Sequence, residues 1–216
     1  MIKTPYLLFL GDAPDALAAK VAQGIKDWRP ENAVGQFRME GCKADLGLPD
    51  MGLAEARAAG AQTLVIGVAN RGGVISPAWK KVLVAALEEG FDLASGLHNL
   101  LRDEADLAAV AKACGRELHD VRVPDVDYPI ANGVKRSGKR VLAVGTDCSV
   151  GKMYTAMAMD NEMRERGMKS TFRATGQTGI LITGEGVPLD AVIADFMAGS
   201  IEWLTPDNDA DHWDII

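Results

Sequence analysis

The chain has 216 residues, of which 48% are hydrophobic and 25% are charged, so it is globular in composition and long enough for one large or two small domains. Its formal net charge of -7 and pI of about 5.0 provide no basic field for DNA, RNA or an anionic membrane surface. Neither nucleic acid nor a membrane is therefore an expected partner.

The first half of the chain alternates short apolar runs with amphipathic stretches, which is typical of parallel βαβ units. The opening run is too short for the apolar region of a signal peptide and predicts a buried strand. Five strands are predicted, at residues 5–12, 33–39, 62–70, 91–97 and 118–123. The helices predicted between them cover residues 14–28, 51–60, 77–90 and 103–115, the last three ending at glycines that can cap them. We therefore expect a doubly wound α/β unit that ends near Val123.

A segment rich in proline, glycine and basic residues follows, PDVDYPIANGVKRSGKR, and marks a domain boundary. Its basic residues are expected to be solvated, with anion binding as the alternative. A second α/β unit then begins, with predicted strands at residues 140–146, 170–175 and 212–216. The predicted helices are 151–166 and 190–204, and a glycine-rich loop is predicted at 176–186. Because three strands rarely complete a nucleotide-binding sheet, we expect the chain to be a fragment of a longer protein.

The three cysteines, Cys42, Cys114 and Cys148, lie far apart and show neither CxxC nor Cys/His ligand spacing. This pattern argues against a disulfide framework and against structural zinc. We therefore predict no metal site and a location in the reducing cytoplasm. No stretch approaches the ~18 apolar residues of a membrane span.

Residues 145–155 read GTDCSVGKMYT and resemble a phosphate-binding loop, GxxxxGK followed by Ser or Thr, between a strand and a helix. Backbone N–H groups at the helix start and the Lys152 ammonium would bind phosphate oxygens. The alternative is a glycine-rich turn without a ligand. The residues expected to bind the cofactor are Gly145, Thr146, Asp147, Cys148, Ser149, Val150, Gly151, Lys152 and Met153.

Two departures from the loop consensus bear on its chemistry. Gly145 lies one residue early, so Thr146 stands at the consensus glycine position. Met153 stands where a hydroxyl would hold Mg²⁺, and a thioether is a poor ligand for that hard cation. Thr155 lies roughly 200° further round the helix and does not replace it. The sequence thus favours phosphate binding without magnesium-dependent hydrolysis.

The loop string GTDCSVGK resembles that of dethiobiotin synthetase. A broader resemblance covers the whole chain and is carried by ten strings in this order: PYLLFLGD, DWRPE, EGCKADLGLPDM, GVANRGG, SGLHNLL, HDVR, GTDCSVGKMYTA, FRATGQTGILI, VIADFMAGSIEWL and HWDII. They resemble the two-domain P-loop family that includes the DgcN-type D-glutamate N-acetyltransferases. The resemblance implies a Rossmann-like domain (1–125), a linker (126–138) and a P-loop domain (139–216) that continues past Ile216.

The same resemblance implies acetyl transfer from acetyl-CoA to D-glutamate in D-amino acid catabolism. A partner dehydrogenase would then act on the N-acetylated product, and we expect a homo-oligomer. Coenzyme A carries phosphates that the loop can hold without Mg²⁺. The alternatives are a ligase or kinase that uses Mg-ATP, as the dethiobiotin synthetase likeness suggests, and a nucleotide-sensing module without turnover.

Acetylation of an amine needs a base, oxyanion donors and cationic groups for the substrate carboxylates. His98, just past a predicted strand, is the first candidate for the base, with a structural role as the alternative; His119 and His212 lie at strand starts and are set aside. Arg173 is a second catalytic candidate and would also bind a carboxylate, unless it pairs with a structural acid.

Further substrate-binding candidates are Arg71, Gln177 and Thr178. Gln177 and Thr178 could donate to the oxyanion, whereas the Arg71 segment could instead be an ordinary turn. Glu40, Lys43 and Asp45 share one loop that is either a substrate loop or a salt-bridged connection. Cys148, near a helix start, could transiently accept the acetyl group.

Overall fold

The computed structural model describes residues 1–124, 126–147 and 150–216, with the side chain of Arg71 outside that description. The chain divides into two compact units, each with its own parallel sheet. The first unit comprises Met1–Arg122 with Leu181–Glu185, and the second comprises Val123–Ile180 with Gly186–Ile216. The expected α/β class is confirmed, because both units are built on parallel sheets with helices between the strands.

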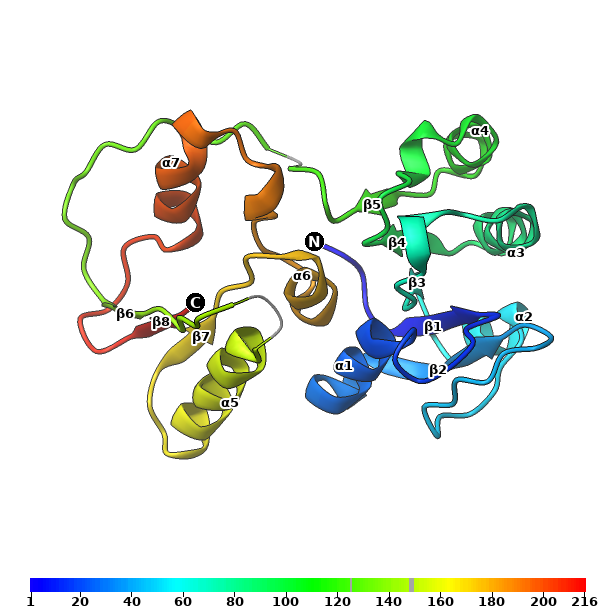
Figure 1. The fold of residues 1–216 in the computed structure, drawn as a ribbon, viewed down its shortest axis with the longest axis horizontal. Helices are drawn as coiled ribbons and strands as arrows, with labels where there is room; N and C mark the ends of the chain where they lie inside the picture. Colours follow the sequence, from blue (N-terminus) through cyan, green and yellow to red (C-terminus); the bar gives the residue numbers. More distant parts are fainter. Residues whose placement is uncertain (125, 148–149) are drawn as a thin grey trace. The chain divides into compact units, whose positions relative to one another are not determined.

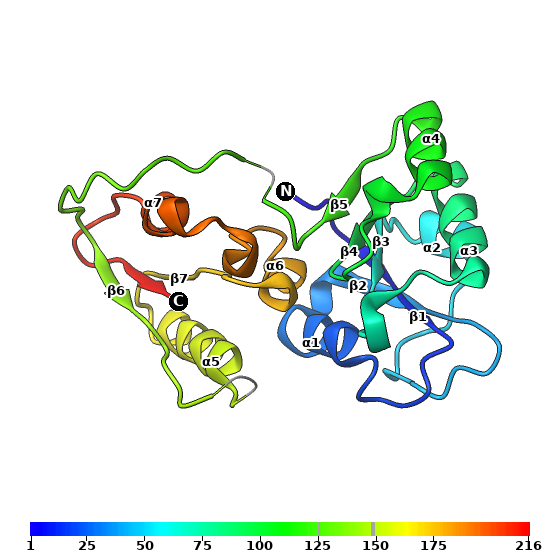
Figure 2. The same cartoon turned by 45° about the horizontal axis from the view of Figure 1, so that its top comes forward.

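The first unit contains a five-stranded parallel sheet in the order β2-β1-β3-β4-β5. Its strands are β1 (Tyr6–Gly11), β2 (Ala33–Arg38), β3 (Thr63–Ile66), β4 (Asp92–Ser95) and β5 (Leu118–Asp120). Its helices are α1 (Lys20–Trp28), α2 (Leu53–Ala58), α3 (Pro77–Glu88) and α4 (Ala105–Cys114). Short 3-10 turns lie at Pro30–Asn32, Arg71–Gly73 and Leu101–Asp103. Helix α1 covers one face of the sheet, and α2, α3 and α4 cover the other (Figures 1 and 2).

The core of this unit follows from its central strands. All six residues of β1 are buried, because β2 and β3 flank the strand and helices cover both of its faces. Strands that are buried on both faces have continuous apolar sequences, here YLLFLG. The strand order reverses between β1 and β3, and in open α/β sheets ligands bind at the carboxyl ends of the strands near that point.

Helix α1 begins at Lys20, six residues later than predicted. The preceding residues form turns, in which the Asp15 carboxylate accepts from the Ala18 N–H at 2.8 Å and the Ala16 carbonyl accepts from the Ala19 N–H at 3.1 Å. An Asp side chain that satisfies a nearby backbone N–H competes with helix formation. The prediction that the helix starts at residue 14 was therefore wrong.

The second unit contains a three-stranded parallel sheet in the order β6-β8-β7. The strands are β6 (Lys139–Val141), β7 (Ser170–Phe172) and β8 (Trp213–Ile215). Its helices are α5 (Lys152–Glu165) and α7 (Ala194–Leu204), on opposite sides of the sheet in Figures 1 and 2, and a 3-10 turn covers Leu189–Ala191.

Residues 176–186, predicted to be a glycine-rich loop, instead contain the helix α6 (Gln177–Thr183). Three consecutive apolar residues, Ile180, Leu181 and Ile182, are buried there. Gly179 is closely packed, because a Cβ at this position would lie 3.0 Å from the Ala174 side chain. Burial of the apolar run thus outweighs the low helix propensity of glycine.

The basic segment before β6 is largely exposed, as predicted, and it also bonds to α7. The backbone N–H groups of Asn132 and Gly133 each donate to the Glu202 carboxylate at 3.0 Å, and these bonds hold the pKa of Glu202 below its ordinary value. Arg136 donates to the Glu202 and Thr205 carbonyls at 2.6 and 3.0 Å. The arginine therefore satisfies carbonyls that the end of α7 leaves free.

No helix in the described part of the chain has both the length and the apolar character required to cross a membrane.

Candidate functional site

The phosphate-loop segment lies between β6 and α5, as its sequence predicts. Gly151 occupies the N-cap of α5 with a φ of 95°, a left-handed conformation that favours glycine. The first turn of the fourteen-residue helix contains no acidic residue, so its exposed N–H groups and dipole suit an anion.

Lys152 crosses back over the loop. Its Nζ donates to the Asp147 carbonyl at 2.6 Å. The stem of the side chain passes Gly145, where a Cβ would lie 3.1 Å from Lys152 Cγ and 2.6 Å from Val150 Cγ2. The displaced glycine thus leaves room for the lysine. Cys148 and Ser149, two of the expected loop ligands, lie outside the described residues.

Met153 and Thr155 are both engaged within the second unit. The Met153 sulfur lies beside Gly179 of α6, 3.5 Å from the position of a Cβ there. The Thr155 hydroxyl donates to the Gly151 carbonyl at 3.0 Å. Met153 has no hydroxyl to hold Mg²⁺, and the Thr155 hydroxyl is bonded back to the N-cap residue of its own helix.

Arg173 forms an ion pair with a buried acid. Its Nε donates to the Asp214 Oδ1 at 2.7 Å, and the Asp214 side chain is completely buried in the central strand β8. Arg140 Nε lies 3.9 Å from the other carboxylate oxygen, and Asn208 donates to both oxygens at 3.3–3.4 Å. In the described part of the chain, the two terminal nitrogens of Arg173 have no protein partner. They remain able to bind a carboxylate, so the pairing does not exclude a substrate role.

The carboxyl edge of the second sheet gathers several of the predicted residues. Because β6, β7 and β8 are parallel, the phosphate loop and the turn into α6 start from the same edge. Gln177 and Thr178 form the first turn of α6, and the contact of Met153 with Gly179 confirms that α5 and α6 are neighbours.

His98 lies in the first unit, at the carboxyl edge of its sheet. The Asn99 N–H donates to the Gly73 carbonyl at 3.0 Å, so the turns after β3 and β4 are joined. His98 therefore shares this edge with the turn that contains Arg71, whose side chain lies outside the description. Arg71 and His98 belong to the first unit, and Arg173, Gln177 and Thr178 belong to the second.

Among the described residues, one cluster of three side chains of the kinds that bind metal ions lies at the amino edge of the first sheet, opposite the edge with His98. Single ligand atoms of Asp92, Glu117 and His119 lie within 4.8 Å of one another. Lys3 Nζ lies 2.9 Å from Asp92 and 3.2 Å from Glu117, which raises the lysine pKa. An ammonium group thus already supplies the positive charge that a metal ion would bring.

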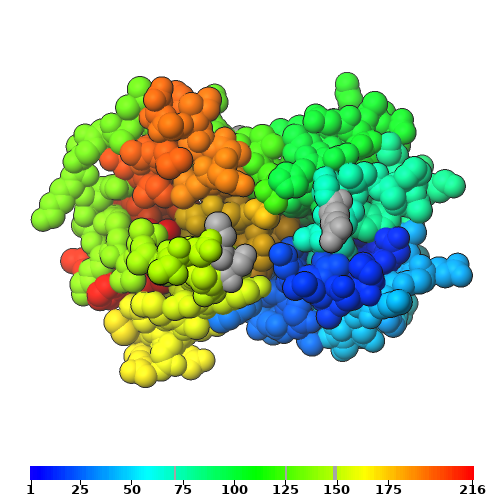
Figure 3. All heavy atoms as spheres, viewed as in Figure 1, coloured from blue at the N-terminus to red at the C-terminus, as the bar shows by residue number. Residues whose placement is uncertain are grey.

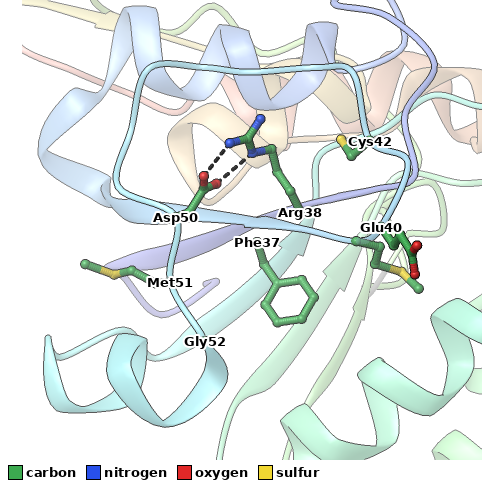
Figure 4. Close-up of a pocket in the computed structure, with 8 residues that line it drawn as sticks. Phe37, Arg38, Glu40, Cys42, Asp50, Met51 and Gly52 are labelled. Carbon is green, nitrogen blue, oxygen red and sulfur yellow. Dashed lines mark hydrogen bonds and ion pairs between the residues drawn. The ribbon is translucent and has the colours of Figure 1, made fainter.

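Sequence reasoning missed a surface pocket of about 500 Å³ at the end of β2 (Figure 4). Glu40 was recognised there, but Arg38, Asp50 and the apolar lining were not. Asp45 was correctly placed in a salt-bridged loop, since it lies 3.6 Å from Arg38. An arginine at the last position of a strand was the local signal that could have indicated the pocket.

Two family models match the chain. Residues 37–124 match the Rossmann-like domain DUF1611_N, and residues 129–216 match the P-loop domain DUF1611_C, both described as domains of unknown function. A crystal structure of a DUF1611 family protein from Anabaena variabilis superposes with a TM-score of 0.76 at 29% identity, covering 99% of this chain and 65% of that one.

Two curated relatives are similar along the whole chain, and both are named D-glutamate N-acetyltransferase. The protein from Tritonibacter scottomollicae is 82% identical over 216 residues, and that from a Pseudoalteromonas species is 47% identical over 215 residues. The chain spans 65% of the length of each relative.

Proposed function

Because the chain belongs to the DUF1611 family, we propose that its protein is an N-acetyltransferase that moves an acetyl group from acetyl-CoA to the amino group of D-glutamate. The names of the two relatives support this activity and substrate. The observation in the molecule that carries the proposal is a phosphate loop with its lysine in place and its magnesium hydroxyl missing.

A phosphate loop without a magnesium ligand is compatible with acetyl transfer from acetyl-CoA. Phosphates of coenzyme A would be held by the N–H groups at the start of α5 and by the Lys152 ammonium. No phosphoryl group is transferred in this reaction, so the reaction does not need the Mg²⁺ ligand that Met153 replaces. The same residue disfavours the alternative, a ligase or kinase that depends on Mg-ATP.

We assign the acid–base role to His98. The His98 imidazole would take one proton from the substrate ammonium, and the freed amine would attack the thioester carbonyl carbon. The C–S bond would then break, and the second proton lost by the nitrogen would go to the CoA thiolate. The amide N–H and side chains of Gln177 and Thr178 would donate to the oxyanion. In the second unit the outer nitrogens of Arg173 are a candidate for binding a substrate carboxylate, and in the first unit Arg71 is a separate candidate.

We also propose a cellular location, an oligomeric state and a metabolic partner. Cys42 and Cys114 are free thiols, which fits the reducing cytoplasm. A homo-oligomer and a dehydrogenase that consumes N-acetyl-D-glutamate complete the proposed setting.

The test is an assay of the intact protein with acetyl-CoA and either D- or L-glutamate, followed by release of free CoA thiol and by mass spectrometry of the product. N-acetyl-D-glutamate formed faster than the L-isomer supports the proposal. Acetylation of neither enantiomer rejects it. Mg-ATP hydrolysis that Lys152→Ala abolishes would favour the ligase or kinase, and ligand binding without turnover would favour the sensing module.

A further inference from the structure

Asp12, the first residue after β1, has a carboxylate that the fold holds in place but does not neutralise. Trp79 Nε1 donates to Asp12 Oδ1 at 2.8 Å. Among the side chains that the structure describes, no lysine or arginine forms an ion pair with this acid. Asp120 at the end of β5 differs, because Arg102 lies 3.0 Å from its carboxylate. Asp12 therefore leaves a negative charge at the carboxyl edge of the first sheet.

The donor to Asp12 is a rigid and buried ring. Trp79, in the first turn of α3, is 3% exposed and packs edge-on against Phe9, with ring centroids 5.3 Å apart. Gly11 leaves room for the indole, since a Cβ on Gly11 would lie 2.6 Å from that ring, and its φ of 54° also favours glycine. An acid held by such a donor loses little conformational freedom when it binds a ligand.

Asp12 is exposed to solvent although its partner Trp79 is buried. Residues 12–19, between β1 and α1, are largely exposed, and dark blue atoms from the start of the chain lie at the surface in Figure 3. The second carboxylate oxygen of Asp12 has no protein partner in the described part of the chain. It is therefore available to a ligand that arrives from solvent.

Asp12 shares the carboxyl edge of the first sheet with His98. Strands β1 and β4 lie on either side of β3, so their ends are roughly 10 Å apart at the usual strand spacing. Two side chains and an ammonium group between them can bridge this separation. One short segment, residues 73–79, bonds to both places, because its first residue accepts from the Asn99 N–H at 3.0 Å and its last residue donates to Asp12. The acid and the imidazole are thus placed by the same segment.

We propose that Asp12 binds the ammonium group of the D-glutamate substrate and that Trp79 positions the Asp12 carboxylate. This inference rests on the proposed function, because it names the group that presents the substrate nitrogen to His98. An ammonium group forms charge-assisted hydrogen bonds with a carboxylate, whereas a substrate carboxylate would be repelled. After His98 removes one proton, the neutral amine still has N–H groups that donate to Asp12 while its lone pair attacks the thioester.

The test is isothermal titration of D-glutamate into the intact protein with coenzyme A present, so that binding is measured without turnover. The comparison probe is glutarate, which has both carboxylates of glutamate but no ammonium group. Asp12→Asn should raise the dissociation constant of D-glutamate by about tenfold or more, because a charge-assisted hydrogen bond is lost. The same substitution should leave the dissociation constant of glutarate unchanged or lower. Glu31→Gln, an exposed acid in the turn before β2, is the matched control and should change neither.

Trp79→Phe keeps a ring against Phe9 but removes the N–H donor, so D-glutamate should bind several-fold more weakly and glutarate as before. The proposal is overturned if the unsubstituted protein does not bind D-glutamate, if Asp12→Asn binds it as well as Glu31→Gln does, or if binding of D-glutamate and of glutarate weakens together. Failure to acetylate D-glutamate while its binding still depends on Asp12 would reject the proposed reaction but not this site.

Discussion

Gly73 lies directly against His98: a Cβ on Gly73 would come within 2.6 Å of the His98 backbone nitrogen and 2.9 Å of its Cβ. Gly73 also has a φ of 61°, which side chains disfavour. The position of the proposed base is therefore determined by a glycine on another turn.

The first prediction concerns this contact. Gly73→Ala should lower the rate of acetyl transfer more than Gly72→Ala does. Both residues have positive φ, and each substitution should cost about 1–2 kcal/mol of unfolding free energy from the backbone. Only Gly73→Ala also displaces His98, because Gly72 meets only the Val74 side chain, at 3.3 Å. Steady-state kinetics and urea unfolding measure the two effects, and equal losses of rate would contradict the assigned role of His98.

The second prediction concerns Lys152. Lys152→Ala should weaken CoA binding by roughly tenfold or more, since a charge-assisted contact to phosphate is lost. Unfolding free energy should change little, because the Lys152 ammonium bonds only a carbonyl of its own loop. Isothermal titration measures the affinity, and Lys112→Ala on α4 is the matched control. Unchanged affinity would show that the loop does not hold CoA.

The third prediction concerns metal removal. Treatment with EDTA should leave the rate of acetyl transfer unchanged, because Met153 packs beside Gly179 and the Thr155 hydroxyl is bonded to Gly151. The rate is measured before and after chelation. A loss of activity that Mg²⁺ restores would refute a metal-free mechanism.

The fourth prediction separates two roles of Arg173. Asp214→Asn should lower the unfolding free energy of the second unit by about 2–4 kcal/mol. This is a low value for breaking a buried ion pair, because 19% of the Arg173 side chain is exposed to solvent. Arg173→Lys keeps the charge but loses the forked geometry, so KM for D-glutamate should rise with little change in stability. Urea unfolding and kinetics of both variants are compared. If Arg173→Lys loses stability while KM is unchanged, the arginine is structural.

The fifth prediction concerns pH. Burial lowers the pKa of His119 from its ordinary value of 6.5, against the opposing charges of Glu117 and Asp92. Lys3 and the chain's amino group act in the same direction as burial. The unfolded chain therefore binds a proton at higher pH than the folded one, and stability should fall as pH drops below about 6.5 through the folded pKa.

His119→Gln should flatten this part of the pH profile. Chemical unfolding at pH 7.5, 6.5 and 5.5 measures it, and an unchanged slope in the variant would assign the acid sensitivity to other groups.

Much of the fold could be predicted because burial leaves a direct mark on the sequence. Strands covered on both faces, such as β1, are continuous apolar runs, and glycines with positive φ, such as Gly115 and Gly167, end helices where expected. Helix α6 was missed because the four glycines within residues 176–186 suggested a loop. Its helical state depends on burial of Ile180 to Ile182, which only the tertiary structure reveals.

The candidate site was predictable only where its residues are close in sequence. The loop around Lys152 has a fixed spacing between strand and helix, so its position was predicted correctly. The partner of Arg173 lies 41 residues away, and Asp50 lies 12 residues from Arg38. Neither pairing has a local pattern, because each depends on strands or segments that meet only after folding.

The bond from Lys152 to the Asp147 carbonyl has a consequence for which anions the loop accepts. One of the three N–H donors of the ammonium is used by this carbonyl at 2.6 Å, which holds the ammonium over the loop and leaves two donors for a phosphate. A single inorganic anion can use these two donors. A molecule with several linked phosphates engages the helix N–H groups at the same time and gains from each of them. The lysine and the start of α5 together thus favour a ligand with linked phosphates over a single anion.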